Sequence, residues 1–197
     1  PATRAYIGEQ KTGKSTLALA CAITVATGKS NILGFAPRKT VPVLYLDWES
    51  SGFIQRNRTD RMIHGLGLRV EDIPLYYQQC SMPLEAILQS IKKQIQKHSI
   101  GLIIIDSALL ACSGDLQNPD SVASIMRPLK AFGVSSMVIA HQPKNNLESD
   151  KPFGSTFWSA LPRSTIKMER KNESDDPSIS VLLTHTKSNT SSFLPKF

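Results

Sequence analysis

The stretch Gly8-Glu9-Gln10-Lys11-Thr12-Gly13-Lys14-Ser15 matches the phosphate-binding pattern GxxxxGK[ST]. Residues 3–7 before it are typical of a short strand, and residues 14–27 after it are typical of a helix that ends at Gly28. A glycine-rich turn between a strand and a helix directs backbone N–H groups, and the positive end of the helix dipole, at an anion. The stretch therefore predicts a P-loop, which binds a nucleoside triphosphate.

The chemistry of the motif assigns roles to its side chains. Lys14 is expected to reach the β- and γ-phosphates of ATP, and the Ser15 hydroxyl is expected to hold Mg²⁺. The residues expected to bind the nucleotide are Gly8, Glu9, Gln10, Lys11, Thr12, Gly13, Lys14, Ser15 and Thr16.

Strand and helix patterns alternate along the rest of the chain. Apolar runs predict strands at 43–46, 73–77, 101–105 and 136–140, and helical spacing predicts helices at 53–66, 84–98 and 120–132. Strands that are apolar on both faces and separated by helices indicate an α/β fold with a mostly parallel sheet. Residues 165–169 and 179–184 predict a C-terminal β-hairpin added to that sheet.

The composition is that of one domain. The chain has 197 residues, of which 41% are hydrophobic, so we expect a single domain over 1–197, and its first residue, Pro1, indicates a fragment or a processed chain. Three cysteines without CxxC spacing favour a reducing compartment, which predicts a cytoplasmic protein. No apolar run reaches the length of a membrane span. The net charge of +7 fits both a solvated basic surface and nucleic-acid binding.

A second motif is of the kind that accompanies a P-loop. Ile103-Ile104-Ile105-Asp106 is an apolar strand that ends in an aspartate, at the edge of the sheet where α/β folds bind ligands. Together with the P-loop, this pattern predicts that Asp106 binds Mg²⁺ through water.

A P-loop ATPase also needs a general base that activates water. No carboxylate comes directly after Asp106, because Ser107 and Ala108 follow it. The strand Val43 to Leu46 also ends at the expected nucleotide edge, and two carboxylates, Asp47 and Glu49, come after it. Either one could polarise a water molecule in line with the γ-phosphate, and we favour Glu49.

The segments GEQKTGKST, LDWE, IIIDS and VIAHQ together resemble the RecA-like ATPase core, and within it the RepA-like hexameric replicative helicases, which include AAA-type ATPases of phages and plasmids. The resemblance covers residues 5 to about 189. It implies Mg²⁺-dependent ATP hydrolysis, a homo-oligomeric ring, expected to be a hexamer, and binding of or movement on single-stranded DNA.

The resemblance also implies roles for individual residues. His141 matches the γ-phosphate sensor, with Gln142 as the alternative, and Lys187 matches the cation that enters the nucleotide site of the next subunit, with His185 as the alternative.

Residues 142–153 match the family's second DNA-facing loop. Lys144, Asn145 and Lys151 are the expected phosphate contacts, whereas Glu148 and Asp150 in the same loop repel phosphate.

Two other functions are compatible with a P-loop. One is a nucleotide-switched assembly or clock-type ATPase that does not move on DNA. The other is a small-molecule kinase, which would need an arginine-rich lid and an acceptor pocket, and the sequence shows neither.

Overall fold

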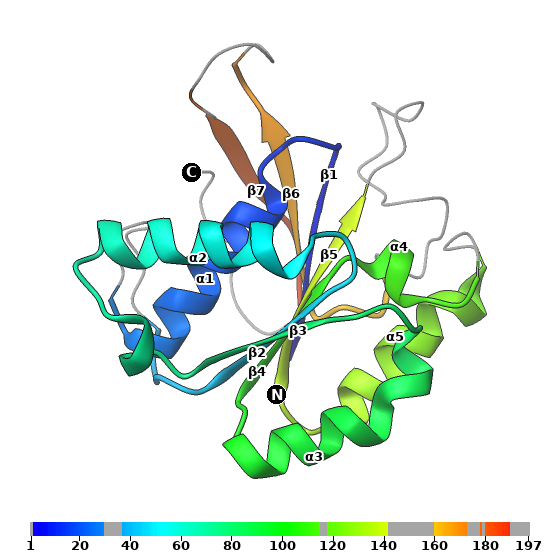
Figure 1. The fold of residues 1–197 in the computed structure, drawn as a ribbon. Helices are drawn as coiled ribbons and strands as arrows, with labels where there is room; N and C mark the ends of the chain where they lie inside the picture. Colours follow the sequence, from blue (N-terminus) through cyan, green and yellow to red (C-terminus); the bar gives the residue numbers. More distant parts are fainter. Residues whose placement is uncertain are drawn as a thin grey trace.

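The computed structural model describes residues 2–29, 37–114, 118–141, 160–172, 178 and 180–189. Its strands are β1 (Thr3–Gly8), β2 (Val43–Asp47), β3 (Leu75–Gln79), β4 (Leu102–Asp106), β5 (Ser135–His141), β6 (Ser164–Arg170) and β7 (Val181–Ser188). They form one seven-stranded sheet in the order β3-β2-β4-β5-β1-β6-β7 (Figure 1).

Strands β1 to β6 are parallel, and only β7 runs antiparallel, paired to β6. The carboxyl ends of the parallel strands therefore meet at one edge of the sheet. The mostly parallel sheet and the C-terminal hairpin confirm the α/β fold that the sequence predicts.

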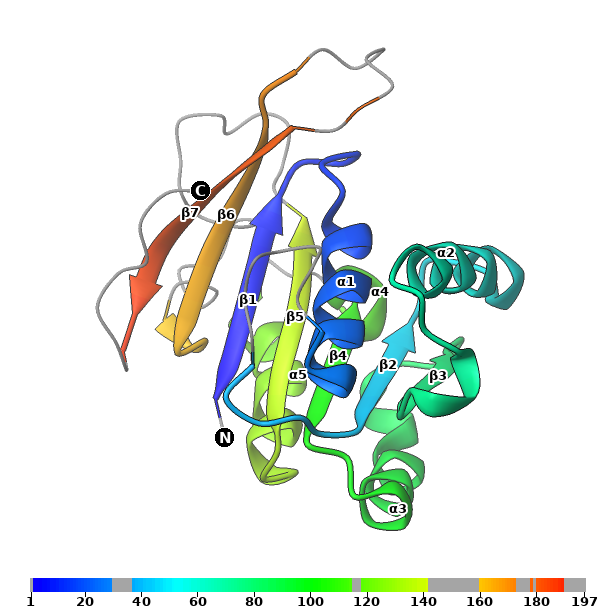
Figure 2. The same cartoon turned by 90° about the vertical axis from the view of Figure 1, so that its left-hand side faces the viewer.

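Helices cover both faces of the sheet (Figure 2). Two helices, α1 (Lys14–Thr27) and α2 (Gly52–Gly65), lie on one face. On the other face lie α3 (Leu88–His98), α4 (Ala108–Ala111) and α5 (Pro119–Ala131). Short 3₁₀ turns, η1 (Val70–Asp72) and η2 (Leu84–Ile87), precede β3 and α3. None of the described helices is long and apolar enough to cross a membrane.

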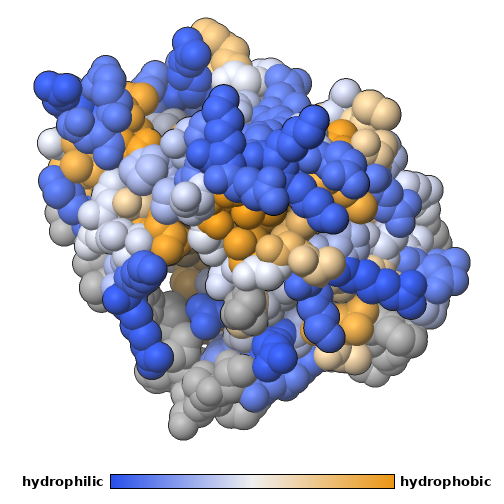
Figure 3. Space-filling view, turned by 90° about the horizontal axis from the view of Figure 1, so that it is seen from below, coloured by the Kyte–Doolittle hydropathy of each residue, from blue (hydrophilic) through white to orange (hydrophobic). Residues whose placement is uncertain are grey.

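The core consists of the two layers between the sheet and its helices. Because side chains alternate along a strand, Ile103 and Ile105 of β4 pack under α4 and α5, whereas Ile104 packs under α1. All three are fully buried. Helix α3 buries Ile91 and exposes Lys92 and Lys93. Seen from below Figure 1, the side on which α3 lies, the surface carries many hydrophilic side chains (Figure 3).

Several predicted element boundaries are wrong. β3 starts at Leu75 instead of residue 73, because the chain up to Ile73 closes a 3₁₀ turn and Pro74 has no N–H to donate to the sheet. β7 spans Val181–Ser188 rather than 179–184. Helix α5 begins at Pro119 instead of residue 120, because the side chain of Asn118 accepts from the Asp120 backbone N–H and caps the helix.

Candidate nucleotide and magnesium site

The sheet order brings four strand ends together. Strand β5 lies between β4 and β1, so that His141 pairs in register with Gly8 of the P-loop. On the other side of β4, Asp47 of β2 pairs with Asp106. Residues from four separate parts of the chain therefore converge at one edge, where the sequence analysis expects the nucleotide.

The P-loop backbone includes two residues in the left-handed region, one of which is a glycine. Gly13 and Lys11 have φ values of 79° and 62°, both in the left-handed region. At Gly8, a Cβ atom would lie 2.6 Å from the Met168 carbonyl oxygen, so no larger residue fits between β1 and β6. Helix α1 has Gly13 as its N-cap, with no side-chain cap and no acidic residue in its first turn. Its N-terminal N–H groups are thus suited to a phosphate.

Lys14 is folded back inside this loop. Its Nζ donates to the Gly8 carbonyl oxygen at 2.9 Å, to the Glu9 carbonyl oxygen, and to Thr12 Oγ1 at 3.3 Å. Burial lowers the pKa of Lys14 to about 8, although the carboxylates of Glu49, Asp106 and Glu9 oppose this shift. The cation lies at the P-loop as expected, and its contact with phosphates stays a prediction.

Asp106 is buried, with 1% of its surface exposed, and its two oxygens differ. Oδ2 accepts a hydrogen bond of 2.6 Å from Tyr45 Oη. Oδ1 is also buried but has no hydrogen-bond partner within the described parts of the chain. Burial raises the pKa of Asp106, while the hydroxyls of Tyr45 and Ser15 act in the opposite direction.

This environment fits a magnesium ion. Mg²⁺ takes oxygen ligands, commonly one or two carboxylates together with substrate phosphates and water. Asp106 offers an oxygen without a partner, and the hydroxyl of Ser15 is close enough to affect its pKa. Among the described residues there is no cluster of three or more His, Cys, Asp or Glu side chains that could hold a metal ion.

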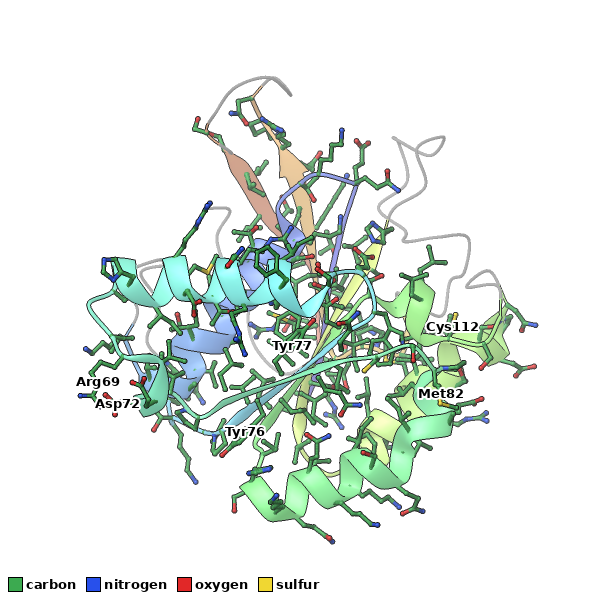
Figure 4. The ribbon with its side chains drawn as sticks, viewed as in Figure 1. Arg69, Asp72, Tyr76, Tyr77, Met82 and Cys112 are labelled. Atoms are coloured by element: carbon green, nitrogen blue, oxygen red, sulfur yellow. The ribbon has the colours of Figure 1, made fainter. Side chains whose placement is uncertain are left out.

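Asp47 is fully buried and is used to build the turn after β2. Its Oδ1 accepts from the backbone N–H groups of Glu49 and Ser50, both at 2.8 Å, and its Oδ2 accepts from Tyr77 Oη at 3.2 Å. Tyr77 lies below α2 in the view of Figure 4. A carboxylate with these contacts is not available to water, which favours Glu49 over Asp47 as the base.

Glu49 faces the same edge, and its side chain is 32% exposed. Its Oε1 accepts from Ser107 Oγ at 2.5 Å and from His141 Nε2 at 2.7 Å. The hydrogen bond from His141 is the largest of the effects that lower the pKa of Glu49; Ser107 and Lys14 add to it, and burial opposes it. Glu49 is therefore held as a carboxylate. Its other oxygen, Oε2, makes no hydrogen bond to the described residues.

His141 contacts the proposed base directly. Its side chain is 15% exposed, and its Nδ1 is buried without a hydrogen-bond partner in the described part of the chain. The structure therefore brings the expected sensor residue and Glu49 together, a contact that the sequence analysis did not predict. Contact of His141 with a γ-phosphate stays a prediction.

Comparisons with known proteins agree with this geometry. A family model described as an AAA domain matches residues 3–146. The chain belongs to this family. No curated protein matches the chain. Among solved structures, it is similar to a KaiC-like protein from the hyperthermophilic archaeon Pyrococcus horikoshii OT3, with a TM-score of 0.69 and 13% identity, over 99% of this chain and 83% of that chain.

These findings confirm the RecA-like α/β fold and make the chain a P-loop ATPase of the AAA type. The family implies nucleotide binding, and the oxygen donors at Asp106 and Ser15 suit the Mg²⁺ that usually accompanies it. The expected closeness to RepA-like helicases is not shown by these comparisons, and neither is a helicase activity.

In this AAA domain, Lys187 and His185 lie on β7, which is separated from β1 by β6. Strand β7 runs antiparallel, so Lys187 pairs with Thr165, near the amino end of β1. Its Nζ donates to the Ala160 carbonyl oxygen at 2.6 Å. His185 Nε2 shares a hydrogen bond of 2.8 Å with Ser164 Oγ. Neither residue belongs to the nucleotide edge of its own subunit, and a role in a neighbouring subunit stays a prediction.

The expected DNA contacts Lys144, Asn145 and Lys151, and the alternative sensor Gln142, lie outside the described residues of the AAA domain.

The sequence analysis missed two contributors to the site, Ser107 and Tyr45. Ser107 was noted only as a residue that could not be the base. Tyr45 lies inside an apolar strand and hydrogen-bonds across to the Asp106 carboxylate of the neighbouring strand. Outside the site, Tyr77 makes a similar hydrogen bond to Asp47, which builds the turn. One signal was available for Tyr45: it stands two residues before Asp47, and therefore on the same face of the sheet.

Proposed function

We propose that this AAA domain hydrolyses ATP with Mg²⁺ and couples hydrolysis to binding of, or movement along, single-stranded DNA in a ring of identical subunits. The observation that carries the proposal is the 2.7 Å hydrogen bond between His141 Nε2 and Glu49 Oε1. His141 is the last residue of β5, and the segment expected to contact DNA, 142–153, follows it directly. A single residue thus connects the proposed base with the proposed DNA-binding segment.

In the hydrolytic step, the oxygen of a water molecule bonds to the γ-phosphorus while the bond from that phosphorus to the β–γ bridging oxygen breaks. Glu49 orients the water through its free oxygen and receives the proton that the water loses. Lys14 and the N-terminal N–H groups of α1 bind the phosphate oxygens. Asp106 and Ser15 would hold Mg²⁺, which would neutralise charge that develops on the phosphates.

Coupling requires that DNA binding changes the hydrogen bond between His141 and Glu49. A shift of His141 caused by phosphates bound at Lys144, Asn145 and Lys151 would change how Glu49 presents its free oxygen. In the ring, Lys187 of a neighbouring subunit supplies a further cation at the transferring phosphoryl group.

A second candidate function is a nucleotide-switched assembly, and the structural likeness to a KaiC-like protein favours it. In that case ATP would control association of the subunits, and single-stranded DNA would not change the hydrolysis rate.

A titration of ATP turnover against single-stranded DNA, with particle mass measured in the same buffer with ATP, tests the proposal. We expect turnover to rise with single-stranded DNA, and a triple change of Lys144, Asn145 and Lys151 to Ala to abolish the rise while leaving basal turnover unchanged. ATP-dependent assembly without any rise would contradict DNA coupling and support the switch. Turnover that requires a small acceptor molecule would instead indicate a kinase.

A further inference from the structure

Tyr45 lies behind the proposed metal site. It is in the middle of β2, its side chain shares a face of the sheet with Asp47, and it is 1% exposed. The phenol reaches across to the next strand, where Oη donates to Asp106 Oδ2 at 2.6 Å. Both partners of this hydrogen bond are excluded from water.

This hydrogen bond makes the two oxygens of Asp106 inequivalent. A carboxylate can rotate about its last side-chain bond, and in an apolar environment a fixed donor is needed to select one orientation. With Oδ2 bonded to Tyr45, the orientation of the carboxyl plane is set, and Oδ1 is the oxygen without a partner among the described residues. Ser15, the other expected magnesium ligand, also interacts with this carboxylate.

We propose that Tyr45 is a positioning residue for Mg²⁺ binding: its hydroxyl holds Asp106 Oδ2 so that Oδ1 faces the metal and its water ligands. The inference rests on the proposed Mg²⁺-ATP site. Residues that hydrogen-bond to groups around a metal commonly determine its affinity, although they do not touch it.

The fold contains a matched control for this role. Tyr77 is on β3, and its hydroxyl donates to Asp47 Oδ2 at 3.2 Å. The two tyrosine rings have centroids 6.3 Å apart. Tyr77 therefore makes the same type of hydrogen bond to a carboxylate that builds a turn, and Tyr77→Phe removes a hydroxyl without touching Asp106.

The test measures binding of a fluorescent ATP analogue to the full chain, in EDTA and across a Mg²⁺ titration. For Tyr45→Phe we expect the Mg²⁺ concentration at half-saturation to rise about 10-fold, the lower end of the range for lost outer-shell hydrogen bonds. Affinity in EDTA should stay within about twofold of the unchanged protein, since the P-loop is intact. Tyr77→Phe should leave both quantities unchanged.

A double-mutant cycle adds a readout that a purely structural role would not move. If Tyr45 acts through Asp106, Tyr45→Phe should have no further effect on Mg²⁺ half-saturation in an Asp106→Asn background. An additive effect, an unchanged half-saturation in Tyr45→Phe, or an equal shift in Tyr77→Phe would overturn the inference. Loss of binding in EDTA by Tyr45→Phe alone would also overturn it, by showing that Tyr45 supports the fold.

The outcome for the unchanged protein separates this inference from the proposed function. If the unchanged protein binds the analogue without any dependence on Mg²⁺, the proposed site itself is wrong. If it shows that dependence and Tyr45→Phe does not alter it, only the role of Tyr45 is wrong.

Discussion

Asp47 and Asp106 occupy paired positions at the ends of the neighbouring strands β2 and β4. Both are buried, and each accepts a hydrogen bond from a tyrosine hydroxyl. They differ in the second oxygen: Oδ1 of Asp47 accepts two backbone N–H groups, whereas Oδ1 of Asp106 has no partner among the described residues. The chain that follows each strand therefore decides whether its terminal carboxylate builds a turn or remains able to bind a ligand.

The largest effect is expected at Glu49, the carboxylate that the Asp47 turn positions. Glu49→Gln keeps the shape of the side chain and one acceptor oxygen but removes its basicity, so turnover should fall by about 10²- to 10⁴-fold. ATP affinity should be retained, because the P-loop is unchanged. Phosphate release and equilibrium ATP binding, measured on one preparation, check this. Retained turnover would rule out Glu49 as the base.

Much of the fold around Asp47 and Asp106 could be predicted from the sequence. Helix α1 has the predicted bounds because glycines in the left-handed conformation, Gly13 and Gly28, stand at both of its ends. The strand that ends in Asp106 was identifiable from its continuous apolar run. These features depend on residues that are close together in the sequence, which is why pattern and spacing were sufficient.

The division of roles at the site could not be predicted in the same way. The choice between Asp47 and Glu49 depends on backbone N–H groups that point back at Asp47 only after the turn has formed. The hydrogen bonds from Tyr45 to Asp106, and from His141 and Ser107 to Glu49, join strands whose adjacency comes from the order of the sheet. Single-sequence patterns do not specify that order.

The free energy of unfolding tests whether Asp47 supports the turn after β2. Asp47→Ala leaves the backbone N–H groups of Glu49 and Ser50 without their acceptor, so the free energy of unfolding should fall by about 1–3 kcal/mol. Asp60→Ala, at an exposed position of α2, should change it by less than about 0.5 kcal/mol. Urea unfolding followed by circular dichroism gives both values. Equal values for the two variants would show that Asp47 does not support the turn.

A smaller effect is expected in the pH dependence. The pKa of Glu49 is lowered in the folded protein, so its ionised form is favoured by folding. That contribution to stability is present above the ordinary value of about 4.3 and is lost as the pH falls through the lowered pKa.

Replacing His141 with Ala removes the largest cause of this shift. The acidic limb of the turnover profile should therefore move to higher pH in His141→Ala. His98, which stacks on Tyr76 at the end of α3, provides the control, and His98→Ala should leave the profile in place. If the two variants have the same profile, the hydrogen bond from His141 does not set the ionisation of Glu49.

The most direct test of the division between the two aspartates is a Mg²⁺ titration of ATP binding in Asp106→Asn and Asp47→Asn, measured side by side. If Asp106 holds the metal through water and Asp47 only builds the turn, Mg²⁺ half-saturation should rise by about 10- to 100-fold in Asp106→Asn. It should be unchanged in Asp47→Asn. Equal shifts in the two variants, or a shift confined to Asp47→Asn, would contradict the account.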